Sequence, residues 1–185
     1  MELSTAQRYD IESAQARLDG MVARACNRSQ HMLWQGAALR EVLTALATVG
    51  EVVSGPGAAC SILILDKDGL LRNGASPNLP PDYLDAIDRL KPDPRVGTCA
   101  AAAATGCMVI TPDFHADDKW GELRHLPLAL GFVEAWSIPI KSSSGDVLGT
   151  FGTYLRERRE PSLSEIQAVE TLVTAAAIAI AIAKS

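Results

Sequence analysis

Two stretches in the second half of the chain alternate large and small side chains and are separated by a polar turn. Residues 134–141 (EAWSIPIK) and 147–155 (VLGTFGTYL) flank the segment Ser-Ser-Ser-Gly-Asp. A period of two is typical of strands, and a glycine-containing turn between two such runs predicts an antiparallel hairpin. This hairpin restricts the chain to folds that contain a central sheet.

The remaining elements fit around that sheet. Residues 58–65 are nearly all apolar, which is typical of a buried central strand, and Asp66-Lys67-Asp68-Gly69 predicts a turn into a partner strand at 70–75. A further strand is expected at 107–111. Helices are expected at 5–34, 37–53, 81–90, 98–105 and 162–183. Antiparallel hairpins interrupted by helices indicate an α+β domain.

The two terminal helices differ in the strength of their apolar seams. Ser162 and Glu165 form a capping box at the start of the last helix, whose apolar residues then follow a regular spacing of three and four. We expect part of this face to pack on the chain's own first helices and the rest to form a dimer seam. The first helix has Gly20 and Arg28 in its seam, and it is either a surface helix or a coiled-coil arm for dimerisation.

Composition and charge exclude several functions. With 48% hydrophobic and 21% charged residues the chain of 185 residues can bury a full core. A net charge of -5 argues against binding to nucleic acid or an anionic membrane, because both require a basic face. The longest apolar run, 172–183, is shorter than the roughly 18 to 20 residues that span a bilayer. No signal peptide is visible, so we expect a cytoplasmic protein with reduced cysteines.

The order of the motifs resembles a GAF domain. The segments VGTCAAAAATG, HADDKW, WSIPI and GDVLGTF occur in the order found in GAF domains of bacterial sensor histidine kinases and diguanylate cyclases. The resemblance covers roughly residues 37–183. We therefore divide the chain into a helical arm at 1–36 and a GAF domain at 37–185 that includes the last helix.

The resemblance implies a fold and a class of function. The fold is an antiparallel sheet of about six strands, with the terminal helices on one face and a ligand pocket on the other. The implied function is sensory: a small molecule of unknown identity binds, the terminal helices form a homodimer, and the signal passes to a histidine kinase or cyclase output domain. No catalytic role is expected, and no cofactor can be assigned.

The start of the helix at 98–105 is the first candidate for the pocket. Gly97 and Thr98 could hold an anion through free backbone amides. Cys99 lies in the first turn, where the helix dipole would lower the pKa of its thiol and favour redox chemistry. A second interpretation is that Cys99 only packs against the alanine-rich surface.

Aromatic and polar residues supply the other candidates. Trp120 from a covering loop and Trp136 from a strand could provide apolar area and one donor each. Strand alternation allows only one of Trp136 and Ser137 to face the pocket, and Phe151 shares a face with Thr153 on the next strand. Asp113 and His115 lie in the covering loop, where His115 could bind a metal or haem iron, although the spacing matches no metal motif.

Three further functions stay open beside the small-molecule sensor. Gly97-Thr98-Cys99 is similar to the cysteine turn of free methionine-(R)-sulfoxide reductases, which are GAF proteins, but residues 108–185 contain no second cysteine to resolve the intermediate. The chain could also be a haem- or metal-dependent gas sensor, or a purely structural dimerisation domain. Neither the Asn-Lys signature of cyclic-nucleotide GAF domains nor the Cys-His pair of bilin-binding ones is present.

Overall fold

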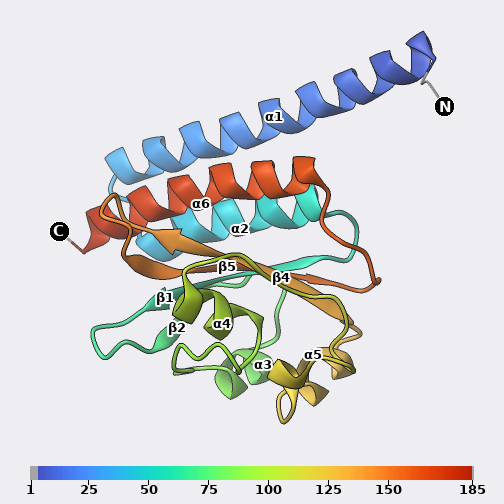
Figure 1. Ribbon diagram of the computed structural model, residues 1–185. Helices are drawn as coiled ribbons and strands as arrows, with labels where there is room; N and C mark the ends of the chain where they lie inside the picture. The colour runs from blue at the N-terminus through green and yellow to red at the C-terminus, as the bar shows by residue number, and fades with distance from the viewer. Residues whose placement is uncertain (1–3, 185) are drawn as a thin grey trace.

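A five-stranded antiparallel sheet divides the computed structural model, which describes residues 4–184, into two unequal layers (Figure 1). The strand order is β2-β1-β5-β4-β3. The strands are β1 (Ala59–Leu65), β2 (Leu71–Ala75), β3 (Val109–Thr111), β4 (Glu134–Lys141) and β5 (Val147–Leu155). The α+β class is confirmed, and the strand count is close to the six or so that the resemblance implies.

Long helices cover one face of the sheet and short ones cover the other (Figure 1). The first layer contains α1 (Thr5–Trp34), α2 (Leu39–Ser54) and α6 (Leu163–Ala183). The opposite layer contains α3 (Pro81–Ala86), α4 (Thr98–Thr105), the 3-10 helix η1 (Asp118–Trp120) and α5 (His125–Ala129). Because a different helical layer lies on each face of the sheet, the two faces of its strands contact different sets of side chains.

Most element boundaries agree with the sequence prediction. Ser162 and Glu165 form the expected capping box, with Glu165 N donating to Ser162 Oγ at 3.2 Å and Ser162 N donating to Glu165 Oε2 at 2.8 Å. The helix expected at 81–90 ends earlier, at Ala86, and Leu90 instead forms an isolated bridge with Leu71. The strand expected at 107–111 begins at Val109.

The apolar seam of α6 is used largely inside the domain. By length and composition alone, its 21 residues would be sufficient to cross a membrane. However, the helix lies against α1, α2 and the central strands, and the side chains of Val169, Leu172, Ala176 and Ile180 are fully buried in the main core. This packing explains much of the helix's apolar character.

Only part of α1 belongs to the domain. Leu18, Val22, Ala25 and Cys26 pack on the main core. The amino-terminal half projects past the body of the molecule, and its Ile11 is exposed (Figure 1). The predicted arm therefore packs on its own domain at one end and is free to meet a partner at the other; residues 1–3 and 185 lie outside the described part.

Candidate functional site

Helix α4 lies flat on the sheet face opposite the terminal helices. It begins after Gly97, which has a positive φ of 58°, and it stops at Gly106 in the left-handed region. Both positions require backbone geometry that glycine adopts at little cost. Five consecutive alanines between the two glycines let the helix approach the strands closely, and the side chains from Thr98 to Ala103 are all buried.

The strands under α4 form a floor of small side chains. Ser61 of β1, Gly152 of β5 and Ser137 of β4 lie in one cross-strand row, and Thr150 faces the same side one step along β5. A Cβ added at Gly152 would lie 2.6 Å from Cys99 Sγ, which shows how closely α4 approaches this row. Larger residues at these positions would push the helix away.

Five side chains meet between this floor and the short helices. We define the polar cluster as Tyr83, Cys99, Ser137, Thr150 and Tyr154. The hydroxyls of Ser137, Thr150 and Tyr154 all lie near the Cys99 thiol, but those of Ser137 and Thr150 lack the geometry of a hydrogen bond to it. Tyr83 packs edge-on against Tyr154, with ring centroids 5.9 Å apart. The cluster therefore joins α3, α4, β4 and β5.

The polar cluster is closed to solvent and incompletely paired. None of its five side chains is more than 7% exposed. Within residues 4–184, Tyr83 Oη, Ser137 Oγ and Thr150 Oγ1 make no hydrogen bond of ordinary geometry. Buried polar groups nearly always have a partner, and an unpaired one costs on the order of 1–3 kcal/mol. Three such hydroxyls in one place leave unused hydrogen-bonding capacity beneath α4.

Burial keeps the cluster uncharged. It raises the pKa of the Cys99 thiol, and the three neighbouring hydroxyls only partly counteract this rise. Burial also raises the pKa values of Tyr83 and Tyr154. The sequence-based expectation that the helix dipole would lower the pKa of Cys99 was therefore wrong, because desolvation of the thiolate outweighs the dipole.

The loop that covers α4 is held by two of the predicted site residues. Trp120 Nε1 donates to Thr98 Oγ1 at 3.0 Å, and Thr98 Oγ1 is 2.9 Å from Thr111 Oγ1. Phe114 packs on the Trp120 ring with centroids 4.6 Å apart, and the backbone N of Gly97 donates to the carbonyl of Lys119 at 2.7 Å. Gly97, Thr98 and Trp120 thus lie together, as the sequence suggested, and close the site.

Asp113 and His115 do not reach the polar cluster. Asp113 accepts a hydrogen bond from the backbone N of His115 and forms an ion pair with Arg158 at 2.8 Å. His115 is exposed, and its carbonyl accepts a hydrogen bond from Arg124. Among residues 4–184, no group of three or more His, Cys, Asp and Glu side chains is arranged to hold a metal ion.

Three predicted site residues lie on the wrong face of the sheet. Trp136 and Phe151 belong to the core under the terminal helices, and Thr153 Oγ1 lies 3.6 Å from Cys60 Sγ on that side. The space between the sheet and α2 takes the large side chains: a Cβ added at Gly50 would lie 2.7 Å from Phe151 Cζ. Since neighbouring strand residues alternate, Ser137, Thr150 and Tyr154 face the site instead.

The sequence did contain a signal for the missed residues. Once Ser137 rather than Trp136 is assigned to the site, the register pairs it with Gly152 and places Thr150 and Tyr154 on the same face. Tyr83 lies in the helix expected at 81–90, among apolar residues such as Leu84 and Ile87. Its hydroxyl distinguishes it from those residues, but nothing local in the sequence shows where it points.

Arginines in the segment that connects β5 to α6 contact both the layer of short helices and the layer of terminal helices. Arg156 donates to the carbonyls of Gly57 and Leu130, and its guanidinium lies 4.5 Å from the centroid of the Phe132 ring. A Cβ added at Gly131 would lie 2.7 Å from Arg156 Nη1. Arg156 therefore fits against the loop that precedes β4.

Arg159 connects the same segment to the terminal helices. Its guanidinium binds both carboxylate oxygens of Glu165 in α6, at 2.7 and 2.9 Å, and donates to the carbonyl of Ser54 at the end of α2. Its backbone N donates to Glu134 Oε2 at the start of β4. With the Arg158–Asp113 pair, the connection contacts the covering loop, β4, α2 and α6.

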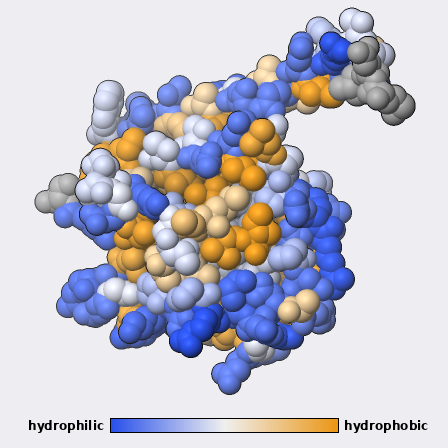
Figure 2. All heavy atoms as spheres, in the orientation of Figure 1, coloured by the Kyte–Doolittle hydropathy of each residue, from blue (hydrophilic) through white to orange (hydrophobic). Residues whose placement is uncertain are grey.

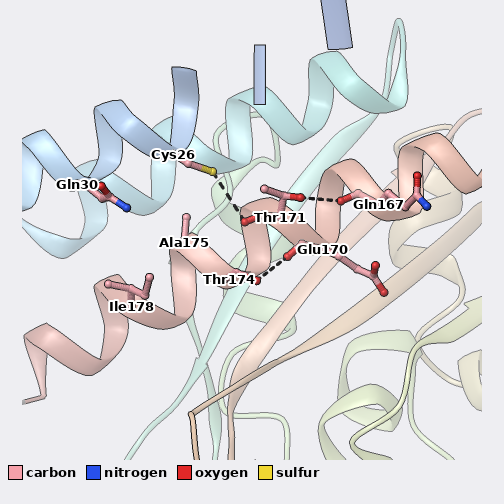
Figure 3. A pocket seen from close by; sticks show the side chains of 8 residues that line it. All are labelled: Cys26, Gln30, Gln167, Glu170, Thr171, Thr174, Ala175 and Ile178. Carbon is pink, nitrogen blue, oxygen red and sulfur yellow. Dashed lines mark hydrogen bonds between the residues drawn. The ribbon is translucent and has the colours of Figure 1, made fainter. Parts of the chain in front are cut away.

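A hollow lies between the terminal helices α1 and α6. It measures about 470 Å³ and is lined by residues of α1 and α6 (Figure 3). Cys26 Sγ donates across it to the carbonyl of Thr171 at 3.8 Å, while Gln30, Gln167 and Glu170 make its rim polar. It is open and shallow, unlike the closed polar cluster.

Comparison with known proteins identifies the family. The family model of the GAF domain matches residues 36–181. The chain belongs to the GAF domain family. It is 37% identical over 155 residues to the methyl sulfide methyltransferase-associated sensor of Methanosarcina acetivorans. This match covers 83% of the chain but only 15% of that much longer relative.

Solved GAF domains share the fold at low identity. A GAF domain of a phosphoenolpyruvate-protein phosphotransferase from Coxiella burnetii matches with a TM-score of 0.69 and 19% identity, covering 88% of this chain and 94% of that one. A domain from Sinorhizobium meliloti, described as part of a two-component sensor histidine kinase protein, matches with a TM-score of 0.66 and 20% identity, covering 80% and 94%. A phycocyanobilin-bound GAF domain from a cyanobacterial phytochrome gives 0.60 and 19%, covering 89% and 94%.

Proposed function

We propose that this GAF domain is a non-enzymatic sensor that binds a small molecule at the polar cluster. The observation that carries the proposal is the set of three buried, unpaired hydroxyls, on Tyr83, Ser137 and Thr150, beneath α4. A bound molecule that pairs them would stabilise one arrangement of α4 and the covering loop over others. Such a difference in affinity between two arrangements is what a sensor requires.

The signal would pass to the helical layer through the arginine connection. The covering loop contacts Arg158 through Asp113, and Arg159 binds Glu165 in the first turn of α6. A shift of the loop would therefore change the forces on the start of α6 and the end of α2. Small displacements of packed helices are a common form of signal transmission.

The output side of the proposal is a homodimer that acts on a further domain. Ile178 and Ile182 of α6 remain 42% and 54% exposed, and apolar side chains gather around α6 and the strands below it (Figure 2). We propose that this surface and the free half of α1 meet a second copy of the chain in the cytoplasm. The partner would be a histidine kinase or cyclase domain.

The chemistry of the thiols supports a sensor over a reductase. A nucleophilic cysteine acts as its thiolate, and burial raises the pKa of Cys99. Cys60 lies on the opposite face of the sheet, and Cys107 lies beyond the carboxyl end of α4. Gas sensing through His115 has less support, since that residue is exposed and apart from the polar cluster.

The test is stabilisation by natural small molecules. A cell extract restricted to small metabolites is added to the purified chain, and the unfolding midpoint and the hydrogen exchange of α6 are measured. We expect saturable stabilisation and altered exchange in residues 163–170. The variant Ser137→Ile, which fills the cluster, should lose both effects, whereas Thr174→Val, on the side of α6 that lines the hollow with α1, should keep them. No effect of the extract on the wild-type chain would contradict the proposal.

A further inference from the structure

The floor beneath α4 carries only uncharged hydrogen-bonding groups. Ser61, Ser137 and Thr150 provide hydroxyls from the strands, Tyr83 and Tyr154 provide phenols, and Cys99 provides a thiol, all of them buried. Ser61 Oγ also accepts a hydrogen bond from Ser76 Oγ at 2.9 Å, so the polar surface continues toward β2. Each hydroxyl can both donate and accept.

Charged side chains of the covering loop have partners outside this floor. Lys119 pairs with Asp117 at 2.6 Å in the covering loop, and Arg158 pairs with Asp113. Arg124 donates to the carbonyl of His115. Burial is the largest cause of the raised pKa values of Cys99 and Tyr154, and the other causes are members of the polar cluster itself.

The side chains that line this floor would therefore supply no counter-ion to a charged occupant. Transfer of an ion from water to a closed, low-dielectric site costs several kcal/mol unless an opposite charge is present. An uncharged molecule avoids this cost and can pair the free hydroxyls of Tyr83, Ser137 and Thr150. Because hydroxyls adapt as donors or acceptors, such a molecule can offer either kind of group.

We propose that the polar cluster selects a compact, uncharged molecule that carries both hydrogen-bond acceptors and donors, such as a small amide. This inference rests on the proposed sensory function and adds the chemical class of the ligand. The small floor residues and the closed aromatic walls favour a molecule of few atoms. The two left-handed glycines that bound α4, Gly97 and Gly106, are the points at which the helix can move outward to admit it.

Three probes of nearly the same planar shape separate charge from size. Acetamide is neutral, acetate is an anion, and acetamidinium is a cation. Each is titrated at matched ionic strength while the backbone amide signals of Ser137, Thr150 and Gly152 are followed by nuclear magnetic resonance. We expect saturable shifts with acetamide in the millimolar range, since a probe with so few atoms has limited binding energy. Acetate and acetamidinium should bind at least tenfold more weakly.

Site variants and a matched control complete the test. Ser137→Ala and Thr150→Val, the second of which keeps the shape of the side chain, should each weaken acetamide binding severalfold. Thr174→Val, on the opposite face of the molecule, should leave it unchanged. Chemical shifts away from the site report whether each variant is folded. If one of the two site variants does not fold, Tyr154→Phe replaces it in the titration.

The outcomes distinguish this inference from the proposed function. Tighter binding of either ion than of acetamide, no saturable shift with any probe, or no effect of the site variants would overturn the inference. A cell extract passed through a mixed-bed ion-exchange resin gives an independent reading, because only uncharged molecules pass. Loss of stabilisation after the resin would refute the inference and leave the sensor standing, whereas an untreated extract without effect would refute the sensor itself.

Discussion

Gly152 sets the distance between α4 and the sheet. Because an added Cβ would lie 2.6 Å from Cys99 Sγ, either the helix or the strand must move to accept a larger residue. We expect Gly152→Ala to lower the free energy of unfolding by about 1–3 kcal/mol, as overpacking of a core does. Chemical denaturation provides the measurement.

The double variant Gly152→Ala/Cys99→Ala tests the cause of that loss. Removal of the sulfur frees the space that the new methyl group needs, so the two substitutions should be non-additive and the double variant more stable than their sum predicts. Gly20→Ala is the control, since its Cβ would meet only the flexible end of Arg24. Simple additivity would mean that the contact does not limit the packing.

Glu134 is a buried carboxyl whose protonation is linked to folding. Burial raises its pKa above the ordinary value of 4.5, and the hydrogen bond from the backbone N of Arg159 only partly offsets this. An acid with a raised pKa in the folded state favours folding while protonated, and that contribution is lost as the pH rises through the folded pKa.

Glu134→Gln removes this dependence on pH. The unfolding free energy of the wild-type chain minus that of Glu134→Gln should therefore decrease as the pH rises above about 4.5 and then level off. Denaturation at a series of pH values measures the difference curve, which is independent of any constant offset from the new amide. A curve that rises with pH would show that the hydrogen bond from the Arg159 backbone N and the attraction to the Arg159 charge dominate instead.

At the scale of elements, Arg159 fastens α6 to the rest of the domain. Arg159→Lys keeps the charge but loses the two-point contact with Glu165 and the bond to the Ser54 carbonyl, because an ammonium cannot span both. We expect a loss of about 1–2 kcal/mol and faster hydrogen exchange in the first turns of α6. Amide exchange resolved by mass spectrometry checks both the size and the place of the effect.

Arg95→Lys is the matched control for that substitution. Its ion pair with Asp93 also involves two guanidinium nitrogens, but its side chain is 85% exposed, where such pairs contribute little. Equal effects of the two substitutions, or protection of α6 unchanged in Arg159→Lys, would argue that the arginine connection does not hold the helix.

How well each element was predicted depended on how far apart in the sequence the interacting residues lie. The capping box at Ser162 and the glycine stop at Gly106 depend on neighbours within a few residues, so the sequence was sufficient for both. The early end of α3 depends on Leu71, whose backbone pairs with Leu90. No local pattern could supply that partner.

The candidate site was predictable only in part for the same reason. Gly97, Thr98, Cys99 and Trp120 come from one stretch, and the structure brings them together. The face of β5 was misassigned and that of β4 was left open, because alternation specifies which residues share a face but not which layer that face meets. Tyr83 joins the cluster only through the tertiary fold.

At the scale of the whole molecule, the exposed half of α6 predicts association. Ile178→Glu together with Ile182→Glu places charges in an apolar surface that the domain itself does not cover. We expect the wild-type chain to sediment as a dimer and the double variant as a monomer with unchanged circular dichroism. Val52→Glu, at a residue of α2 that is 61% exposed, should remain dimeric; a monomeric wild-type chain would contradict the proposed assembly.

The two faces of the sheet have a consequence for how such a domain can diversify. Ser137 and Thr150 look toward the site, while their chain neighbours Trp136 and Phe151 look toward the terminal helices. A substitution at one position changes the chemistry on its own side and leaves the side chains of the other layer in place. Evolution can therefore change the residues of the site face one at a time. The packing of the terminal helices, which we propose transmit the signal, stays the same.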